Sequence, residues 1–230
     1  MPGKTCYIMA GGELLGAPYL YEEFLLDRKP LFAADRGGEY LWQWDLAPAM
    51  IAGDFDSIDH PTLKEMQKAG VPWQKYPEEK DETDLEIMAK IVLKKGFLRI
   101  NILGAWGGRP DQTLGSIAVL HKIKKKGAHG LLLNPWNSVE MIGKRICLNP
   151  KPGVDFSLLP WAGPVRGLNI RGCKYNGQDL ILNPDETRGL SNRIESQAGH
   201  IEFEEGLLLL IRHFNYPFGL KAFQDKEQNE

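Results

Sequence analysis

Hydrophobic residues follow two alternating patterns over the first part of the chain. Short apolar runs, typical of strands that are buried on both faces, alternate with segments whose apolar residues recur every three or four positions, as on one face of a helix. The predicted strands cover residues 5–10, 31–34, 49–52, 71–76, 99–103, 130–134 and 139–142. The predicted helices cover residues 19–26, 39–44, 61–69 and 112–125, with one more that opens at Thr83. This order predicts an α/β domain with a mainly parallel sheet and helices on both of its faces.

The pattern changes near residue 144. Helical periodicity ends there, and short apolar runs alternate with glycine, proline and asparagine, at residues 154–159, 165–171, 179–182, 200–203 and 207–213. Such runs are typical of a small all-β domain built as an antiparallel sandwich or a partial barrel. We therefore predict an α/β domain over residues 1–143 and a β-rich, sandwich-like domain over residues 144–230. The polar tail after Phe218 is expected to fray.

Acidic and glycine-rich segments fall where the predicted strands of the first domain end. The aspartates of these segments are Asp35, Asp54, Asp56, Asp84 and Asp111. In open α/β sheets, ligands bind beyond the carboxyl ends of the strands. Several candidate segments at the same edge of a sheet are stronger evidence for a ligand site than any one segment.

The segment from Gly53 to Ser57 is the first candidate for a metal site. It follows a buried strand, and residues two apart on an extended chain point the same way, so Asp54 and Asp56 are expected to lie side by side. Two anions held together repel each other unless a cation lies between them, and oxygen ligands suit Mg²⁺. A polar turn without a metal explains the same residues, because glycine, aspartate and serine are ordinary turn residues.

Two other aspartates also have a purely structural interpretation. Thr83 with Glu86 three residues later forms a capping-box pattern, and it places Asp84 in a first helical turn, where the helix dipole alone favours an acid. Asp111 stands where an N-cap of the next helix is expected. The glycines before Asp111 form neither a Walker A motif nor a dinucleotide-binding fingerprint.

Composition and charge narrow the classes of function. The chain of 230 residues is 43% hydrophobic and 25% charged, as in soluble globular proteins, and its formal net charge is -2. This charge gives no electrostatic footprint for nucleic acid or for a membrane surface, so an anionic ligand must be attracted by local cations. Three scattered cysteines form no CxxC pair, which argues against a disulfide framework or a zinc site. No secretory signal or membrane-length apolar run is found, and a cytoplasmic location is expected.

Several segments, in their order along the chain, resemble those of the thiamine pyrophosphokinase family. They are Asp35 to Gly38, Gly53 to Ser57, Asp81 to Asp84, Gly107 to Asp111, and the pair Ser191 and Asn192, which is similar to the loop that touches thiamine in the family. The chain departs from the family pattern at Arg36, at Trp106 and at Gln112, where the family usually has histidine.

The resemblance implies transfer of the pyrophosphoryl group of ATP to the hydroxyl of thiamine, which gives thiamine diphosphate and AMP. It implies catalytic roles for Asp54, Asp56 and Asp84, and Mg²⁺ ligands among these three and Asp35. The ATP-binding residues that it implies are Asp35, Gly37, Ser57, Lys80, Thr83, Arg109 and Asp111. Asp84, Ser191 and Asn192 are expected to contact thiamine, in a site between the subunits of a homodimer. Either Asp84 or Asp56 is the general base.

Two alternatives remain at the level of the sequence. A related pyrophosphokinase that acts on another heterocyclic alcohol, such as a pterin, would differ in the pocket for the second substrate. A non-catalytic nucleotide-binding domain would bind ATP without turnover. A sugar transferase with a DxD metal site is disfavoured, because the other acidic and glycine-rich segments accompany Gly53 to Ser57.

Overall fold

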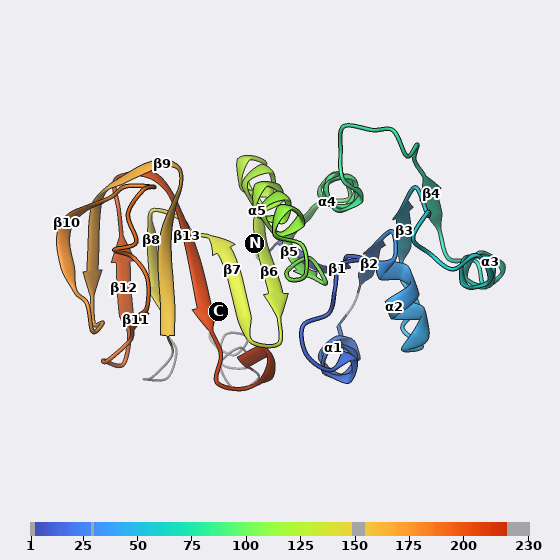
Figure 1. Cartoon of the computed structure of the whole chain (residues 1–230), viewed down its shortest axis with the longest axis horizontal. Coiled ribbons are helices and arrows are strands. Elements are labelled where there is room, and N and C mark those ends of the chain that lie inside the picture. Colours follow the sequence, from blue (N-terminus) through green and yellow to red (C-terminus); the bar gives the residue numbers. More distant parts are fainter. Residues whose placement is uncertain (1–2, 29, 149–154, 220–230) are drawn as a thin grey trace. The chain divides into compact units, whose positions relative to one another are not determined.

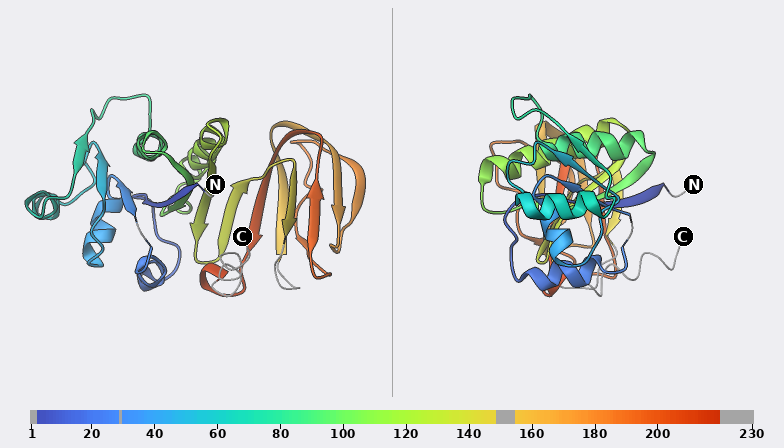
Figure 2. Two further views of the ribbon diagram at one scale, coloured as in Figure 1. Left: turned by 180° about the vertical axis from the view of Figure 1, so that it is seen from behind. Right: turned by 90° about the vertical axis from the view of Figure 1, so that its right-hand side faces the viewer.

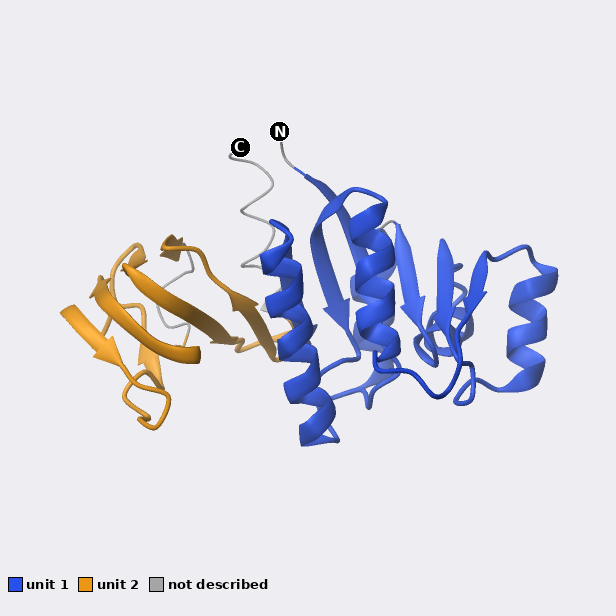
Figure 3. Ribbon diagram, turned by 90° about the horizontal axis from the view of Figure 1, so that it is seen from above, with its two compact units in different colours: residues 1–134 blue, residues 135–230 orange. Residues whose placement is uncertain are grey.

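The computed structural model describes residues 3–28, 30–148 and 155–219 of the chain (Figure 1). The chain divides into two compact units, residues 1–134 and 135–230 (Figure 3), and each unit is described by itself. The boundary predicted from the sequence, after residue 143, lies one strand further along the chain. The fraying expected of the tail concerns residues that are outside the described ones, apart from Gly219.

Unit 1 contains a parallel sheet, as the alternation of apolar runs and helical segments predicted. Its strands are β1 (Lys4–Met9), β2 (Leu31–Ala34), β3 (Met50–Gly53), β4 (Trp73–Lys75), β5 (Phe97–Leu103) and β6 (His129–Asn134). They lie in the order β4-β3-β2-β1-β5-β6, and every neighbouring pair is parallel. All carboxyl ends of these strands therefore meet at one edge of the sheet.

Helices cover both faces of this sheet. They are α1 (Pro18–Leu25), α2 (Gly37–Gln43), α3 (His60–Lys68), α4 (Asp84–Lys94) and α5 (Pro110–Lys125). Helices α4 and α5 lie on one face, and α1 and α2 lie on the other (Figures 1 and 2). Helix α5 begins at Pro110, a residue suited to the first turn, so its N-cap is Arg109. The prediction of Asp111 as this N-cap was therefore wrong, and Asp111 lies in the first turn.

The strand order reverses between β1 and β5. The chain adds β2, β3 and β4 on one side of β1, and α4 then leads back to β5 on the other side. The turns after β1 and β5 meet at this point, where the Gly12 amide donates to the Gly104 carbonyl at 2.8 Å. A Cβ atom on Gly12 would overlap that carbonyl oxygen, so a glycine is required there. Such a reversal is where open α/β sheets form their ligand crevice.

Unit 2 consists of antiparallel strands in two layers, which confirms the predicted sandwich. The strands are β7 (Asn137–Met141), β8 (Arg145–Leu148), β9 (Asp155–Arg171), β10 (Gly177–Leu182), β11 (Asn192–Arg193), β12 (Gly199–Glu202) and β13 (Glu205–His213), followed by the short helix η1 (Pro217–Gly219). One layer pairs β7, β13, β9 and β11, and the other pairs β10, β9, β12 and β8. The strands β8 and β11 were not predicted, because both are short and carry exposed polar side chains.

Strand β9 joins the two layers. The sequence predicted two separate runs over residues 154–159 and 165–171, of which residue 154 lies outside the described residues. The structure has one strand that bends where Ala162 and Gly163 adopt φ values of 61° and 148°. Its first part pairs with β13, and its last part pairs with β10 and β12. One long strand therefore contributes to both layers of the unit 2 core.

Each unit buries one cysteine. Cys6 on β1 is fully buried, and burial raises the pKa of its thiol to about 12. Cys173 is 3% exposed in the core of unit 2, and burial raises its pKa to about 11. Cys147 lies exposed on β8. Leu208, Leu209 and Leu210 on β13 are at most 2% exposed within the chain and therefore belong to its core.

No helix in the described part of the chain is long and apolar enough to cross a membrane.

Candidate functional site

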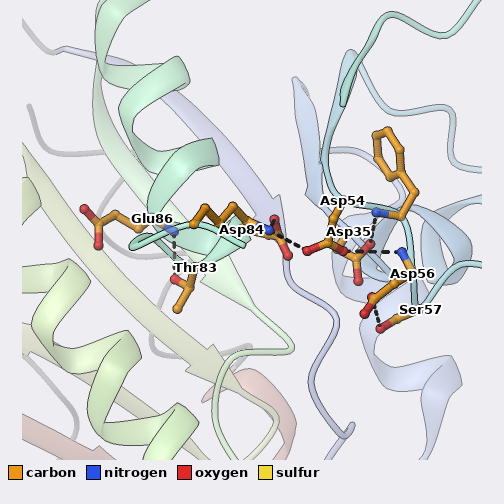
Figure 4. A network of polar contacts seen from close by, with 9 residues as sticks. Asp35, Asp54, Asp56, Ser57, Thr83, Asp84 and Glu86 are labelled. Atoms are coloured by element: carbon orange, nitrogen blue, oxygen red, sulfur yellow. Dashed lines mark hydrogen bonds and ion pairs between the residues drawn. The ribbon is translucent and has the colours of Figure 1, made fainter. Parts of the chain in front are cut away.

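Three carboxylates converge at the carboxyl edge of the unit 1 sheet (Figure 4). Asp35 follows β2, Asp54 follows β3, and Asp84 is the first residue of α4. Each offers an oxygen atom that lies within 4.8 Å of the other two. The parallel sheet and the start of α4 together place these side chains, which are distant in sequence, around one point. We call Asp35, Asp54 and Asp84 the acidic trio.

Two hydrogen bonds to the backbone of the β3 segment fix Asp35, one through its amide and one through its side chain. Its φ of 46° lies in the left-handed region, which aspartate tolerates better than most residues. Its amide donates to the Ala52 carbonyl at 2.9 Å, and its Oδ1 accepts from the Phe55 amide at 3.1 Å. The side chain is only 9% exposed. Asp35 therefore ties the end of β2 to the turn that carries Asp54.

The turn after β3 differs from the extended chain expected from the sequence. Phe55 has a φ of 63°, so the backbone reverses between Asp54 and Asp56. The amide of Asp56 donates to Asp54 Oδ1 at 3.3 Å, while its exposed carboxylate accepts from the Ser57 hydroxyl at 2.7 Å. The chain is therefore not extended here as expected, but the side chains of Asp54 and Asp56 are still neighbours, and the hydrogen bond between them acts to lower the pKa of Asp54. Asp35 and Asp84 are the carboxylates that form one cluster with Asp54, with an oxygen atom of each within 4.8 Å of the others.

Among the described residues, Lys80 is the cation that forms ion pairs with the acidic trio. Its Nζ contacts Asp54 Oδ2 and lies 3.3 Å from Asp84 Oδ1. The Asp84 Oδ1 atom is buried and, apart from this ion pair, accepts no hydrogen bond within the described structure. One ammonium group therefore pairs with two of the three clustered carboxylates, which leaves negative charge uncompensated.

The pKa values of the trio reflect this imbalance. Burial raises the pKa of Asp35 to about 6, and the charges of Asp84 and Asp54 act in the same direction. Burial, followed by the charge of Asp54, also raises the pKa of Asp84. Partial burial is the largest single influence on Asp54 and opposes its ionisation, but the hydrogen bonds from Lys80 and from Asp56, together with the charge of Lys80, outweigh it and lower the pKa. A divalent cation fits this set of oxygen atoms, because it would supply the missing positive charge.

The start of α4 is fixed independently of the trio. The Thr83 hydroxyl oxygen accepts from the Glu86 amide at 3.2 Å, which confirms the predicted cap. The Glu86 carboxylate pairs with Lys122 of α5 at 2.6 Å and with Lys90 at 3.2 Å. These contacts hold the first turn of α4, and thereby Asp84, against the rest of the unit.

Arg109 and Asp111 contact each other, and no described hydrogen bond or ion pair joins them to the trio. Arg109 Nε donates to Asp111 Oδ1 at 3.2 Å, and this hydrogen bond lowers the pKa of Asp111. The two side chains are 72% and 63% exposed. The structure therefore presents them as a local surface pair. Gly37, another predicted site residue, has a packing reason for its identity, since a Cβ atom there would overlap the Met9 carbonyl oxygen.

Two of the predicted thiamine contacts, Ser191 and Asn192, lie in unit 2 beside a cavity of about 380 Å³, whereas Asp84 belongs to unit 1. Asn192 lines the cavity but is buried; its side chain accepts from the Tyr175 amide at 3.0 Å and donates to the Tyr175 carbonyl at 2.9 Å. Ser191 is exposed, with a φ of 57°, and its amide donates to the Ser157 hydroxyl at 3.1 Å. Asn192 thus supports the cavity wall, and Ser191 presents a hydroxyl at the surface.

Other residues of this cavity were not singled out from the sequence. Its lining also includes Ile170, Leu180, Leu182, Leu190, Tyr175, Lys174 and Arg188. Leu190 and Tyr175 are 41% and 56% exposed. The sequence signal that could have indicated this cavity is the presence of large apolar residues, flanked by polar ones, near Ser191. Exposed apolar residues with a polar rim often mark a binding surface.

Comparisons with known proteins agree with this two-part arrangement. Residues 21–132 match the family model described as thiamin pyrophosphokinase, catalytic domain, and residues 145–208 match that described as thiamin pyrophosphokinase, vitamin B1 binding domain. Thiamine pyrophosphokinase of Bacillus subtilis (strain 168) is 29% identical over 211 residues, which cover 91% of this chain and 98% of that protein.

Solved structures show the same fold. The crystal structure of thiamine pyrophosphokinase from Bacillus subtilis has a TM-score of 0.81 at 26% identity, with 91% of this chain and 99% of that chain covered. Yeast thiamin pyrophosphokinase has a TM-score of 0.79 at 18% identity, with 93% of this chain and 87% of that chain covered. The likeness thus extends over both units.

Proposed function

The chain belongs to the thiamin pyrophosphokinase family and transfers pyrophosphate from ATP to thiamine, and we propose that the acidic trio is the centre of this reaction. The convergence of Asp35, Asp54 and Asp84 within 4.8 Å is the observation that carries the proposal. Neither alternative from the sequence, a pterin pyrophosphokinase or a non-catalytic nucleotide-binding domain, is favoured by the comparisons.

The metal proposed for this site is Mg²⁺, held by Asp35, Asp54 and Asp84. Support comes from the excess of negative charge around Lys80 and from the buried Asp84 Oδ1, which accepts no hydrogen bond in the described structure apart from its ion pair with Lys80. When bound, the ion would neutralise charge on the triphosphate. Asp56, also predicted as a ligand, lies outside the trio, and its exposed carboxylate suits the role of general base for the thiamine hydroxyl. Asp84 is the other candidate for that role.

The ATP contacts are proposed at the same edge of the sheet. Lys80 lies between Asp54 and Asp84, where its ammonium group can exchange a carboxylate for a phosphate oxygen. Arg109, at the start of α5, is exposed and able to turn from Asp111 toward phosphate. Asp35, Gly37, Ser57, Thr83 and Asp111 complete the proposed ATP-binding set. Such a transfer requires alignment and charge neutralisation more than covalent catalysis.

The thiamine site is proposed at the unit 2 cavity, with Ser191 and Asn192, and with Asp84 on the side of the reacting hydroxyl. Apolar side chains line the cavity and suit the neutral aminopyrimidine ring of thiamine. Lys174 and Arg188, also in the lining, would repel the positive thiazolium ring, which is therefore expected to point out of the cavity.

A homodimer with the thiamine site between subunits is the proposed assembly. Tyr175, Ile181 and Leu190, near the cavity, are 41–56% exposed and form a suitable apolar surface. In this scheme residues 1–143 bind ATP and the metal, and residues 144–230 bind thiamine and form the dimer. A cytoplasmic location is also proposed, supported by the unbridged thiols of Cys6 and Cys173.

The experiment that tests the reaction uses ATP labelled at the β-phosphorus, with Mg²⁺ and thiamine. Label is expected in thiamine diphosphate, with AMP formed in equal amount and no product from the Asp54→Asn variant. Formation of ADP and thiamine monophosphate would contradict attack at the β-phosphorus. A pterin alcohol in place of thiamine tests the related pyrophosphokinase, and label transfer to the pterin but not to thiamine would favour that alternative.

A further inference from the structure

Arg36 occupies the carboxyl edge of the sheet between the trio and the strand reversal. It directly follows Asp35 of the trio, and its side chain is exposed. A Cβ atom on Gly11, in the turn after β1, would lie 2.8 Å from Arg36 Cβ. The base of the Arg36 side chain therefore borders the turn after β1, on the side of Asp35 away from β3 and β4.

Tyr40 holds the other end of this side chain. The Arg36 guanidinium carbon lies 5.4 Å from the centroid of the Tyr40 ring, in cation–π contact. The Tyr40 hydroxyl donates to the Gly12 carbonyl at 3.2 Å, and the Gly12 amide donates to the Gly104 carbonyl at 2.8 Å. This chain of contacts places the guanidinium beside the point where the turns after β1 and β5 meet.

Arg36 differs from the other cations at this edge in its partners. Lys80 pairs with Asp54 and Asp84, and Arg109 pairs with Asp111. Within residues 3–28, 30–148 and 155–219, no carboxylate pairs with Arg36, whose described partner is an aromatic ring. An arginine that is oriented by a ring but not neutralised keeps its fork of N–H donors for an anion.

We propose that Arg36 binds the α-phosphate of the nucleotide and holds the AMP part of ATP at the strand reversal during transfer. The proposal rests on the proposed function, which places the phosphates of ATP over the acidic trio. Lys80 lies on the β3 and β4 side of Asp35 and Arg36 lies on the β1 side, so the two cations meet different parts of a triphosphate that crosses the trio. The crevice at the reversal then receives the nucleoside.

The chemistry of the step explains why a cation is useful there. The thiamine oxygen forms a bond to the β-phosphorus and passes its proton to a carboxylate, while the bond from the β-phosphorus to the bridging oxygen breaks. That oxygen stays with AMP, so negative charge grows on the α-phosphate as AMP leaves. A guanidinium at the α-phosphate stabilises this charge, and Arg36 acts as a phosphate-binding residue.

The test measures AMP binding by isothermal titration calorimetry, in EDTA and without thiamine, so that neither the metal nor turnover contributes. Arg36→Gln is expected to weaken AMP binding about tenfold, the lower end for a hydrogen bond to a charged group. Arg28→Gln is the matched control, because Arg28 also lies over an aromatic ring, 4.1 Å from the Phe24 centroid, but precedes β2 at the opposite edge of the sheet. The control should bind AMP as the wild type does.

A second pair of variants tests the orienting ring. Tyr40→Phe keeps the ring and should bind AMP within about twofold of the wild type, whereas Tyr40→Leu removes the ring and should weaken AMP binding several-fold, since a cation–π contact at an exposed site contributes roughly 0.5–1 kcal/mol. Circular dichroism and melting temperature establish that each variant is folded.

The outcomes separate this proposal from the proposed function. Wild-type protein that binds AMP, with Arg36→Gln equal to it, would overturn the role of Arg36 and leave the reaction untouched. Wild-type protein that binds no AMP would overturn the role of Arg36 together with the proposed nucleotide site, while the labelled-ATP assay decides the reaction separately. Weakening by Arg36→Gln and Tyr40→Leu, with Arg28→Gln and Tyr40→Phe unchanged, supports the proposal.

Discussion

Asp84 and Asp111 occupy similar positions in their helices, but their side chains lie in different environments. Each lies in the first turn of a helix that follows a strand and a loop, where the helix dipole favours an acid. The Asp84 side chain is 22% exposed and converges with two carboxylates from other loops. The Asp111 side chain is 63% exposed and pairs with Arg109, two residues earlier in its own loop.

The difference shows what distinguishes a candidate site from a helix cap. Local sequence accounts for both aspartates equally well, since either stabilises the start of its helix. Only Asp84 meets charges that are distant in sequence, in surroundings where burial raises its pKa. Convergence of like charges in a buried place is costly unless a ligand compensates for it, whereas an exposed ion pair is common on any protein surface.

The largest expected effect compares Asp54→Asn with Asp111→Asn. Loss of a charge from the trio should lower kcat/KM about a thousandfold or more, because the metal supplies several kcal/mol of charge stabilisation. Asp111→Asn should lower it less than about fivefold, since an exposed ion pair contributes roughly 1 kcal/mol or less. Initial rates at limiting Mg²⁺ measure both. Equal losses in the two variants would remove the distinction between the trio and the α5 loop.

The pH dependence of stability sharpens the same comparison. The pKa of Asp35 in the folded protein is about 6, above its unfolded value near 4, so folded protein binds the extra proton between these values. Without metal, Asp35 therefore favours the folded state at low pH, and this contribution is lost as pH rises through about 6. The loss is on the order of 2 kcal/mol in the free energy of unfolding.

Denaturant unfolding in EDTA between pH 4 and pH 7 measures this effect. Wild-type protein should lose stability relative to Asp35→Asn over that range, and Mg²⁺ should restore it at pH 7. Asp111→Asn is the control, because the pKa of Asp111 is lowered and its titration has the opposite sign. Parallel curves for wild type and Asp35→Asn would contradict the assignment of Asp35 to a buried acidic cluster.

A smaller difference between a buried and an exposed residue is expected in unit 2, where Asn192 is buried and Ser191 is exposed. Asn192→Ala removes the side-chain hydrogen bonds to both backbone groups of Tyr175 and should cost about 2 kcal/mol in the free energy of unfolding. Ser191→Ala should leave stability unchanged and raise the KM for thiamine several-fold, as expected for one neutral hydrogen bond of about 1 kcal/mol. An equal rise in the KM for ATP would argue against a thiamine contact.

The smallest effect is expected for Arg109→Gln. The guanidinium is exposed and already paired with Asp111, so its exchange onto a phosphate gains little, and the KM for ATP should rise only a few-fold. Steady-state kinetics at fixed thiamine measures this change, with kcat expected to stay within about twofold. A hundredfold loss would show that the α5 loop is as central to the reaction as the trio.

Much of the fold and part of the site could be predicted from the sequence. The alternation of apolar runs with helical periodicity predicted the parallel sheet, since parallel strands need a crossover helix between them. Because parallel carboxyl ends share one edge, the aspartates Asp35, Asp54, Asp56, Asp84 and Asp111 were all expected at that edge, and three of them, Asp35, Asp54 and Asp84, form the cluster. The thiamine pyrophosphokinase resemblance added the reaction, which spacing alone does not specify.

The remaining features depend on backbone details that no local pattern encodes. The left-handed φ of Phe55 replaces the extended chain that was expected from Asp54 to Asp56, and a phenylalanine carries no signal for such a φ. The bend at Ala162 and Gly163 merged two predicted strands into β9, because pairing with different partners on either side of the bend outweighed the local turn residues. The buried hydrogen bonds of Asn192 depend on Tyr175, a contact between distant segments.

Because one cysteine is exposed and each unit buries another, chemical labelling of the thiols can report the unfolding of each unit. A thiol reagent such as a maleimide should label exposed Cys147 first, while Cys6 in unit 1 and Cys173 in unit 2 become reactive only when their surroundings open. After Cys147 is blocked, mass spectrometry can follow the labelling of the other two thiols separately in one sample. Equal labelling rates would show that the two units open together, and unequal rates would show which unit opens first.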